Sequence, residues 1–210
     1  MTLVAVVGTG TEVGKTTFAT LWLHALRAAG VQVVGWKPIE SGGDADGRAL
    51  GQASGVRLRQ RYSFPLPISP HLGARALGVR VDLERLARDA RRHLVRHGNV
   101  MLETAGGLFS PLTDDGVSNA ELVRQLAPDV TLLVTRNRLG VLHDVEACHR
   151  AAGASGLPIT AVVLATFGPA DPSQRSNPRE LSRLHDVVTL RGRALGAVAL
   201  RKLSRLVRFT

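Results

Sequence analysis

A glycine-rich stretch at residues 8–17, GTGTEVGKTT, directly follows the apolar run at residues 3–7. The apolar run favours a β-strand, and residues 17–29, which follow Gly-Lys-Thr, are compatible with a helix. Backbone N–H groups in such a turn, with a helix N-terminus behind them, form a concave anion site. Lys15 can reach the terminal phosphates of a nucleotide, and the Thr16 hydroxyl can bind Mg²⁺. The stretch therefore predicts a phosphate-binding loop.

The spacing of this loop departs from the usual pattern of Gly, four residues, then Gly-Lys-Ser/Thr. Counting back from Gly14 reaches Thr9, whereas the glycine lies one place earlier, at Gly8. A glycine-rich strand-to-helix turn without a ligand is the alternative. Gly-Lys-Thr in this context is more specific than glycines alone, so we expect a nucleotide loop with one extra residue.

Apolar, β-rich runs alternate with helix-length segments along the 210 residues. This alternation predicts an α/β fold, P-loop NTPase-like, with a mostly parallel, doubly wound sheet and helices on both faces. We expect one nucleotide-binding domain over residues 1–210. The predicted strands are residues 3–7, 32–36, 100–103, 130–135, 159–165 and 194–199. The predicted helices are residues 15–29, 82–97, 119–126 and 141–153. The Pro-rich residues 64–71 predict a loop.

Four polar segments follow predicted strands, and in open α/β sheets ligands gather at the carboxyl ends of the strands. The segments are residues 8–17, KPIESGGDAD at 37–46, ETAGG at 103–107 and RNRLG at 136–140. We expect them to meet at one edge of the sheet.

Two carboxylates in these segments suit a magnesium site. Glu103 ends an apolar run, and Asp46 lies in the loop after Lys37. Mg²⁺ takes one or two carboxylates together with phosphate oxygens and water, so Thr16, Asp46 and Glu103 make a plausible set. For Asp46, a solvated loop or N-cap position is the alternative, and Asp44 is its rival.

Lys37 precedes Pro38 and would lie beside the nucleotide site. A lysine there can neutralise charge that develops on a transferred phosphoryl group, so Lys37 and Lys15 are the candidate catalytic residues. The alternative is a solvent-exposed Lys37. Only three of the 27 basic residues are lysines, which makes these two positions more notable.

The net charge of +10 would suit an acidic partner, but the arginines are scattered and only residues 201–208 form a dense basic cluster. Few aromatic residues accompany them, so we expect no nucleic-acid partner.

No apolar run approaches the roughly 18 residues of a membrane span, so we expect no membrane partner. Cys148 is the only cysteine, which excludes an intrachain disulfide and favours a cytoplasmic protein.

Four motifs, in this order and spacing, resemble the dethiobiotin synthetase family. They are GTGTEVGKT at 8–16, WKPIESG at 36–42, PISPH at 67–71 and ETAGGLFSPL at 103–112. The resemblance covers about residues 3–145 and weakens afterwards. In this family the loop has five residues between its first glycine and the glycine of Gly-Lys-Thr. The resemblance therefore implies that Gly8 is the first glycine of the loop.

The resemblance implies closure of the ureido ring of dethiobiotin, a step of biotin biosynthesis, from 7,8-diaminopelargonic acid and CO₂ (or bicarbonate). ATP is the co-substrate, Mg²⁺ the cofactor, and a carbamate and a carbamic-phosphoric anhydride are the intermediates. The resemblance also implies a homodimer, in which the loop at residues 138–143 reaches the substrate carboxylate of the partner.

The family's functional positions fall on named residues of this chain. Lys15 and Lys37 match catalytic positions, and Thr16, Asp46 and Glu103 match metal ligands. Nucleotide contacts are implied for Glu12, Val13, Gly14, Lys15, Thr16, Thr17, Asp46, Glu103, Thr104, Ala105, Gly106, Thr166, Phe167, Val198, Ala199 and Leu200. Substrate contacts are implied for Thr11, Lys37, Ser41, Leu139, Gly140 and His143.

The chain departs from the family pattern at several of these positions. Thr104 replaces a glycine, His143 replaces an asparagine, and Thr166-Phe167 stands where Asn-Asp is common. Ala199 replaces a proline in a late nucleotide loop. The resemblance implies that a side chain at Thr104 would crowd the carbamate or the metal. Thr166, Phe167 and Ala199 lie in the region that would bind the base, so they predict a looser choice among nucleoside triphosphates.

Two other functions share this fold. A switch ATPase of the partitioning or metal-delivery type usually carries a further lysine early in the loop, where this chain has Thr9, Gly10 and Thr11. The other alternative is a non-catalytic paralogue that binds nucleotide or nucleic acid through its basic surface, and the departures at Thr104, Thr166 and Ala199 leave it open.

Overall fold

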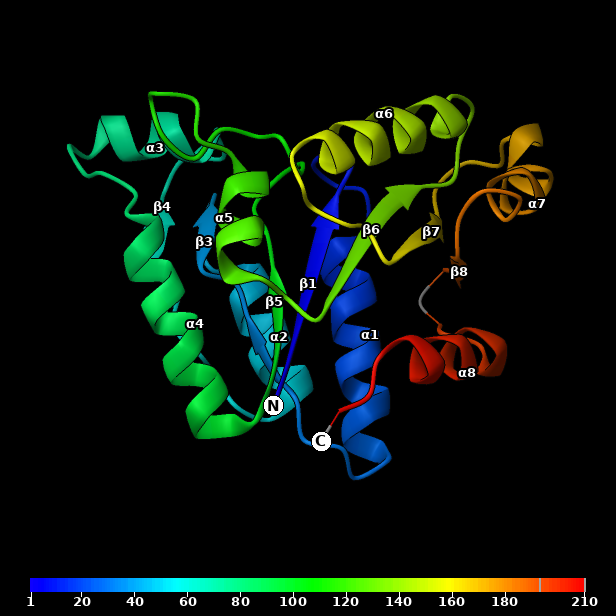
Figure 1. The fold of residues 1–210 in the computed structure, drawn as a ribbon, viewed down its shortest axis with the longest axis horizontal. Helices are drawn as coiled ribbons and strands as arrows, with labels where there is room; N and C mark the ends of the chain where they lie inside the picture. Colours follow the sequence, from blue (N-terminus) through cyan, green and yellow to red (C-terminus); the bar gives the residue numbers. More distant parts are fainter. Residues whose placement is uncertain (193, 210) are drawn as a thin grey trace.

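The computed structural model describes residues 1–192 and 194–209. In this part of the chain, six parallel strands form a sheet in the order β2-β5-β1-β6-β7-β8 (Figure 1). The strands are β1 (Thr2–Gly8), β2 (Val34–Trp36), β5 (Asn99–Glu103), β6 (Val130–Arg136), β7 (Ala161–Thr166) and β8 (Val187–Arg191). Two further strands, β3 (Ile39–Ser41) and β4 (Tyr62–Phe64), pair with each other in a small parallel sheet. The predicted parallel sheet is confirmed.

Helices cover both faces of the large sheet. One face packs against α1 (Lys15–Ala28), α2 (Ala45–Ser54) and α8 (Ala197–Leu206). The other face packs against α3 (Pro70–Ala76), α4 (Leu83–His97), α5 (Asn119–Leu126), α6 (Val141–Ala154) and α7 (Asn177–Leu181). A short 3₁₀ helix spans Pro172–Arg175. Side chains alternate across a strand, so Val4 and Val6 of β1 join the core beside α1 while Ala5 and Val7 pack beneath α5 and α6. Both faces of β1 are buried, as the doubly wound prediction requires.

The predicted strand at residues 194–199 is wrong. The last strand of the sheet is β8, whose Val-Val-Thr-Leu run pairs with β7, and α8 begins at Ala197. Ala199, Leu203 and Val207 are buried and recur at every fourth position, which is the spacing of one face of a helix. The short apolar run that suggested a strand is the first turn of this amphipathic helix. The sequence prediction also missed β3, β4, α2, α3 and α7.

The four predicted segments follow β1, β2, β5 and β6, whose carboxyl ends lie at the same edge of the parallel sheet. The ends of the chain lie at the opposite edge (Figure 1), where the Thr2 hydroxyl donates to the Arg208 carbonyl at 2.9 Å. Among the described residues, none of the helices has the length and apolar character needed to span a membrane.

Candidate active site

The glycine-rich loop after β1 wraps around the side chain of Lys15. The Lys15 ammonium donates to the Gly10 carbonyl at 2.7 Å, and a Cβ atom on Gly8 would lie 3.0 Å from both Cδ and Nζ of Lys15. Such contact is tighter than nearly all real Cβ contacts, so a side chain at position 8 would push Lys15 or Val13 aside. Glycine at position 8 leaves room for the Lys15 side chain inside the loop.

Helix α1 begins at Gly14, which has the left-handed φ of 101° and supplies no side-chain cap. A Cβ atom at Gly14 would also lie 3.1 Å from the Phe167 ring. The first N–H groups of a helix have no partner within the helix and carry partial positive charge, so they favour an anion. The loop and the start of α1 therefore retain the features of a phosphate site.

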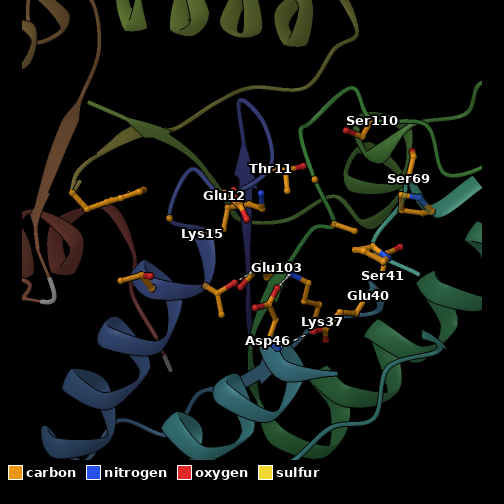
Figure 2. A pocket seen from close by; sticks show the side chains of 18 of the residues that line it. Thr11, Glu12, Lys15, Lys37, Glu40, Ser41, Asp46, Ser69, Glu103 and Ser110 are labelled. Atoms are coloured by element: carbon orange, nitrogen blue, oxygen red, sulfur yellow. Dashed lines mark hydrogen bonds and ion pairs between the residues drawn. The ribbon is translucent and has the colours of Figure 1, made fainter. Parts of the chain in front are cut away.

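Four side chains from three segments meet beside this loop (Figure 2). Lys37 donates to Asp46 Oδ2 at 2.5 Å and to Glu103 Oε1 at 2.6 Å, and the Thr16 hydroxyl donates to the same Glu103 oxygen at 2.7 Å. Glu103 is fully buried at the end of β5, and Lys37 is 5% exposed. The prediction that these residues converge is confirmed, and the solvent-exposed alternative for Lys37 is excluded.

The structure also separates the two rival aspartates. Asp44 pairs with Arg48 and Arg57 on the surface, at 2.5 and 2.9 Å. Asp46, two residues further along, pairs with the buried Lys37. The geometry therefore supports Asp46 as the second carboxylate of the site.

Burial and charge act in opposite directions on the two lysines. Burial lowers the pKa of Lys15 to about 8; Glu103 offsets part of this effect and Lys37 adds to it. Burial also lowers the pKa of Lys37, but the attraction of Glu103 and Asp46 and their hydrogen bonds outweigh it, so the net pKa is raised. Lys37 is thus a fixed cation, whereas Lys15 is a buried ammonium available to an anionic ligand.

Thr16, Asp46 and Glu103 fit a magnesium ion by their chemistry. Glu103 Oε2 is buried and, among the described residues, has no hydrogen-bond partner, so one carboxylate oxygen remains for a ligand. The Asp46 side chain is 40% exposed and accessible from the cavity. The described part of the chain contains no group of three or more His, Cys, Asp or Glu side chains placed to hold a metal. Two carboxylates and a hydroxyl suit a cation that also takes phosphate oxygens and water.

A cavity of about 1090 Å³ extends from this cluster in two directions. Most of the predicted site residues line it: Thr11, Glu12, Gly14, Lys15, Thr16, Thr17, Lys37, Ser41, Asp46, Glu103, Ala105, Gly106, Thr166 and Phe167. Thr104 is buried with its hydroxyl unpartnered among the described residues and does not line the cavity. It therefore does not crowd the cluster from within the cavity.

One end of the cavity, which we call the base end, is formed by Thr166, Phe167, Gly168 and Gly192. The Thr166 hydroxyl accepts from the Asn137 amide at 3.0 Å, and the Arg136 guanidinium lies 4.9 Å from the centre of the Phe167 ring. The sequence prediction missed both glycines, which lie in the loops after β7 and β8.

The predicted nucleotide contacts at residues 198–200 do not line this cavity. They lie in the first turn of α8, where Ala199 is buried in the core and Val198 is 73% exposed. The resemblance implied these contacts by matching this segment to a late nucleotide loop of the family, but here the segment forms the start of α8.

The other end, which we call the substrate end, includes Ser41, Ser69 and Ser110 (Figure 2). Ser41 Oγ is buried and has no hydrogen-bond partner among the described residues, so it remains available to a polar ligand. Prediction from the residues missed Glu40, Pro67, Ile68, Ser69, Pro70 and Ser110. The PISPH motif was the signal for part of this set, since it supplies residues 67–70.

The remaining predicted substrate contacts lie on the other side of the loop. A separate groove of about 620 Å³ is lined by Val13, Phe109, Arg136, Arg138 and His143, among others. Leu139 is 74% exposed, and Gly140 begins α6. These residues do not line the cavity of the same chain.

Comparisons with known proteins place this geometry in context. A family model described as an AAA domain matches residues 2–200. The chain is 38% identical to the ATP-dependent dethiobiotin synthetase of Anaeromyxobacter dehalogenans (strain 2CP-C), over 94% of this chain and 97% of that protein. It is 34% identical to the protein of the same name from Caulobacter vibrioides (strain NA1000 / CB15N), over 76% of this chain and 77% of that one.

Solved structures with similar folds are more distant in sequence. The signal recognition particle receptor FtsY from Elizabethkingia anophelis aligns with a TM-score of 0.59 and 17% identity, covering 98% of this chain and 65% of that chain. The kinase domain of the Escherichia coli tyrosine kinase ETK aligns with a TM-score of 0.53 and 14% identity, covering 80% of this chain and 69% of that chain. At these identities the likeness supports the fold alone.

Proposed function

This chain belongs to the ATP-dependent dethiobiotin synthetase family, and we propose that its cavity closes the ureido ring of dethiobiotin with the residues described above. The family is one of ligases that act in biotin biosynthesis, and ATP is its co-substrate. The observation that carries the assignment of the site is the buried Lys37, held between Glu103 and Asp46 beside the loop that surrounds Lys15.

The reaction begins when an amine of 7,8-diaminopelargonic acid attacks CO₂ and loses a proton, which gives a carbamate. A carbamate oxygen then takes the γ-phosphoryl group of ATP, releasing ADP and forming a carbamic-phosphoric anhydride. The second amine attacks the carbamate carbon, the ring closes, and phosphate leaves. Negative charge gathers near the transferred phosphoryl group throughout, so the site must supply fixed positive charge.

The two lysines supply that charge from different sides. Both line the cavity. Lys15 lies inside the loop and binds the terminal phosphates, while Lys37, four residues before Ser41, neutralises charge on the carbamate and phosphoryl oxygens. Thr16, Asp46 and Glu103 would hold Mg²⁺, which when bound would supply positive charge to the phosphate oxygens. Thr11 and Ser41 orient the diamine.

The remaining parts of the proposal concern assembly and location. We infer a homodimer in which the N-terminus of α6, with Leu139, Gly140 and His143, receives the carboxylate of the partner's substrate. The groove around His143 supports this inference, because it carries Arg136 and Arg138 and lies outside the chain's own cavity. Cys148 is a free, half-buried thiol, which suits a reducing cytoplasm. No nucleic-acid partner is part of the proposal.

Incorporation of labelled carbon tests the reaction. We expect the purified chain, given ATP, Mg²⁺, the diamine and ¹³C-bicarbonate, to form dethiobiotin whose mass increases by one carbon label. Product without the label would contradict the carbamate route. ATP hydrolysis without any ring product would favour a switch ATPase, and nucleotide binding without hydrolysis would favour a non-catalytic paralogue.

A further inference from the structure

Helix α2 has an unusual N-terminus. Asp44 occupies the capping position but makes no side-chain cap, because its carboxylate pairs with Arg48 and Arg57 instead. The cap comes from a distant residue, Glu40 of β3. Glu40 Oε1 accepts from the Asp46 N–H at 2.8 Å, and Oε2 accepts from the Gly47 N–H at 3.0 Å. One carboxylate thus satisfies two helix N–H groups and complements the helix dipole.

Glu40 is itself held rigidly. It is 5% exposed, its backbone lies in the β3–β4 ladder, and Oε2 also accepts from the Gln60 amide at 2.8 Å. A Cβ atom on Gly47 would collide with that amide, so the glycine allows Gln60 and Glu40 to approach the helix. The carboxylate therefore has three donors and a fixed position.

These contacts bear on the active site through Asp46. The Asp46 side chain is 40% exposed and pairs with Lys37, while its backbone N–H bonds to Glu40. Lys37 and Glu40 belong to one short segment, so that segment holds Asp46 at two points, by its carboxylate and by its backbone (Figure 2). Neighbouring atoms would hold a buried side chain in place. The Asp46 side chain is partly exposed, so its position depends more on its backbone, which Glu40 holds.

We propose that Glu40 is a positioning residue that acts through Asp46. It fixes the start of α2 so that the Asp46 carboxylate reaches Lys37, which also pairs with Glu103. In that position Asp46 would serve the metal–nucleotide site. The inference rests on the proposed function only in taking Asp46 as part of a metal–nucleotide site. Glu40 itself keeps its oxygens on the helix N–H groups and on Gln60.

The test measures how much Mg²⁺ strengthens nucleotide binding. We call the ratio of the Kd in EDTA to the Kd in Mg²⁺ the gain from Mg²⁺. A non-hydrolysable ATP analogue is titrated calorimetrically into the full chain, once with Mg²⁺ and once with EDTA. Glu40→Gln replaces one acceptor oxygen with an amide that faces an N–H group. We expect the gain from Mg²⁺ to fall about tenfold, as is common when a partner that orients a metal ligand is lost, and binding in EDTA to stay within about twofold.

Two further variants separate positioning from other roles. Asp44→Asn alters the same loop without touching the Glu40 contacts, and we expect it to leave the gain from Mg²⁺ unchanged. In an Asp46→Asn background, Glu40→Gln should cause no further loss, because a residue that acts through Asp46 has nothing left to position. If the two losses multiply, Glu40 acts independently of Asp46 and the proposal is overturned.

A purely structural role gives a different pattern. In that case Glu40→Gln would lower the melting temperature while the gain from Mg²⁺ stayed at the wild-type value, which would overturn the proposal. If Glu40→Gln does not fold, Gln60→Met removes one donor to Glu40 and should lower the gain from Mg²⁺ by about two- to threefold, a partial form of the same effect. An unchanged gain in that variant also counts against the proposal.

The outcome does not depend on the ring-closing reaction. A wild-type chain that binds the metal–nucleotide but makes no dethiobiotin would refute the proposed function and leave the inference about Glu40 intact. If the wild-type chain makes dethiobiotin but Glu40→Gln keeps the wild-type gain from Mg²⁺, only the inference about Glu40 is refuted.

Discussion

Two regions of the cavity differ in how they can recognise a ligand: the charged cluster beside the loop, which we call the charged end, and the base end. Beside the loop, Lys15, Lys37 and Glu103 are buried charges, and Asp46 completes the cluster. At the base end, the lining consists of Thr166, Phe167 and two glycines, none of which is charged. Fixed charges in a water-poor site act strongly and depend on precise position, whereas an aromatic ring accepts any base. Catalysis should therefore be sensitive at one end and tolerant at the other.

The largest effect is expected at Lys37. Lys37→Ala should lower kcat by about 10²–10³-fold, because it removes a fixed charge from the developing negative charge. Lys37→Arg should restore only part of the rate, since a planar guanidinium does not replace a point charge. Steady-state turnover measures both. Lys202→Ala is the matched control, because Lys202 pairs with Asp186 near α8, away from the cavity. Near-normal turnover in Lys37→Ala would remove this residue from the catalytic set.

Lys15→Ala should be nearly as damaging, with a loss of about 10²-fold or more in kcat. Lys15 contacts the phosphates before and during transfer, so we also expect weaker binding of the ATP analogue, by about tenfold or more. Comparing turnover with calorimetric binding separates the two effects. Binding of the analogue at wild-type strength would show that Lys15 does not contact the nucleotide.

A change at the base end should be milder and of a different kind. Phe167→Ala removes an aromatic surface, and loss of base stacking typically costs about 1–3 kcal/mol. We expect KM for the nucleotide to rise by about tenfold while kcat changes little, because stacking is the same in the ground state and the transition state. An effect on kcat comparable with that of Lys37→Ala would break the distinction between the two ends.

The smallest effect is expected for the choice of nucleotide. The Thr166 hydroxyl already accepts from Asn137, which leaves its O–H as one donor to a base, whereas an asparagine offers both a donor and an acceptor. Turnover with ATP, CTP and GTP should therefore differ by less than about 10²-fold. A stronger preference for ATP would show that groups other than Thr166 recognise the base, and it would narrow the difference between the two ends.

The charged end was accessible to prediction from sequence because its residues belong to segments that follow strands or, at Glu103, end one. Glu103 ends the apolar run of β5, and parallel strands bring such ends together, so its meeting with Lys37 and Thr16 followed from the alternation of elements. What the pattern left open was the choice between Asp44 and Asp46. That choice depends on where α2 begins, which a contact from Glu40 determines.

The base end was harder to predict because the last strand of the sheet was misplaced. Val187–Arg191 and Ala197–Leu206 both carry short apolar runs, and only burial on one helical face tells them apart. The error hid Gly192, which follows β8 and lines the base end. Glu40 was missed for a related reason: its partners are backbone N–H groups of another element, and no spacing along the sequence encodes such a contact.

Phosphate release with one component omitted at a time tests whether the cavity transfers the phosphoryl group to a carbamate. The complete mixture contains ATP, Mg²⁺, bicarbonate and 7,8-diaminopelargonic acid. We expect release to require all four, because the phosphoryl acceptor is a carbamate made from the diamine and CO₂. Release at the full rate without the diamine would contradict this expectation, since the cavity would then transfer phosphate to water.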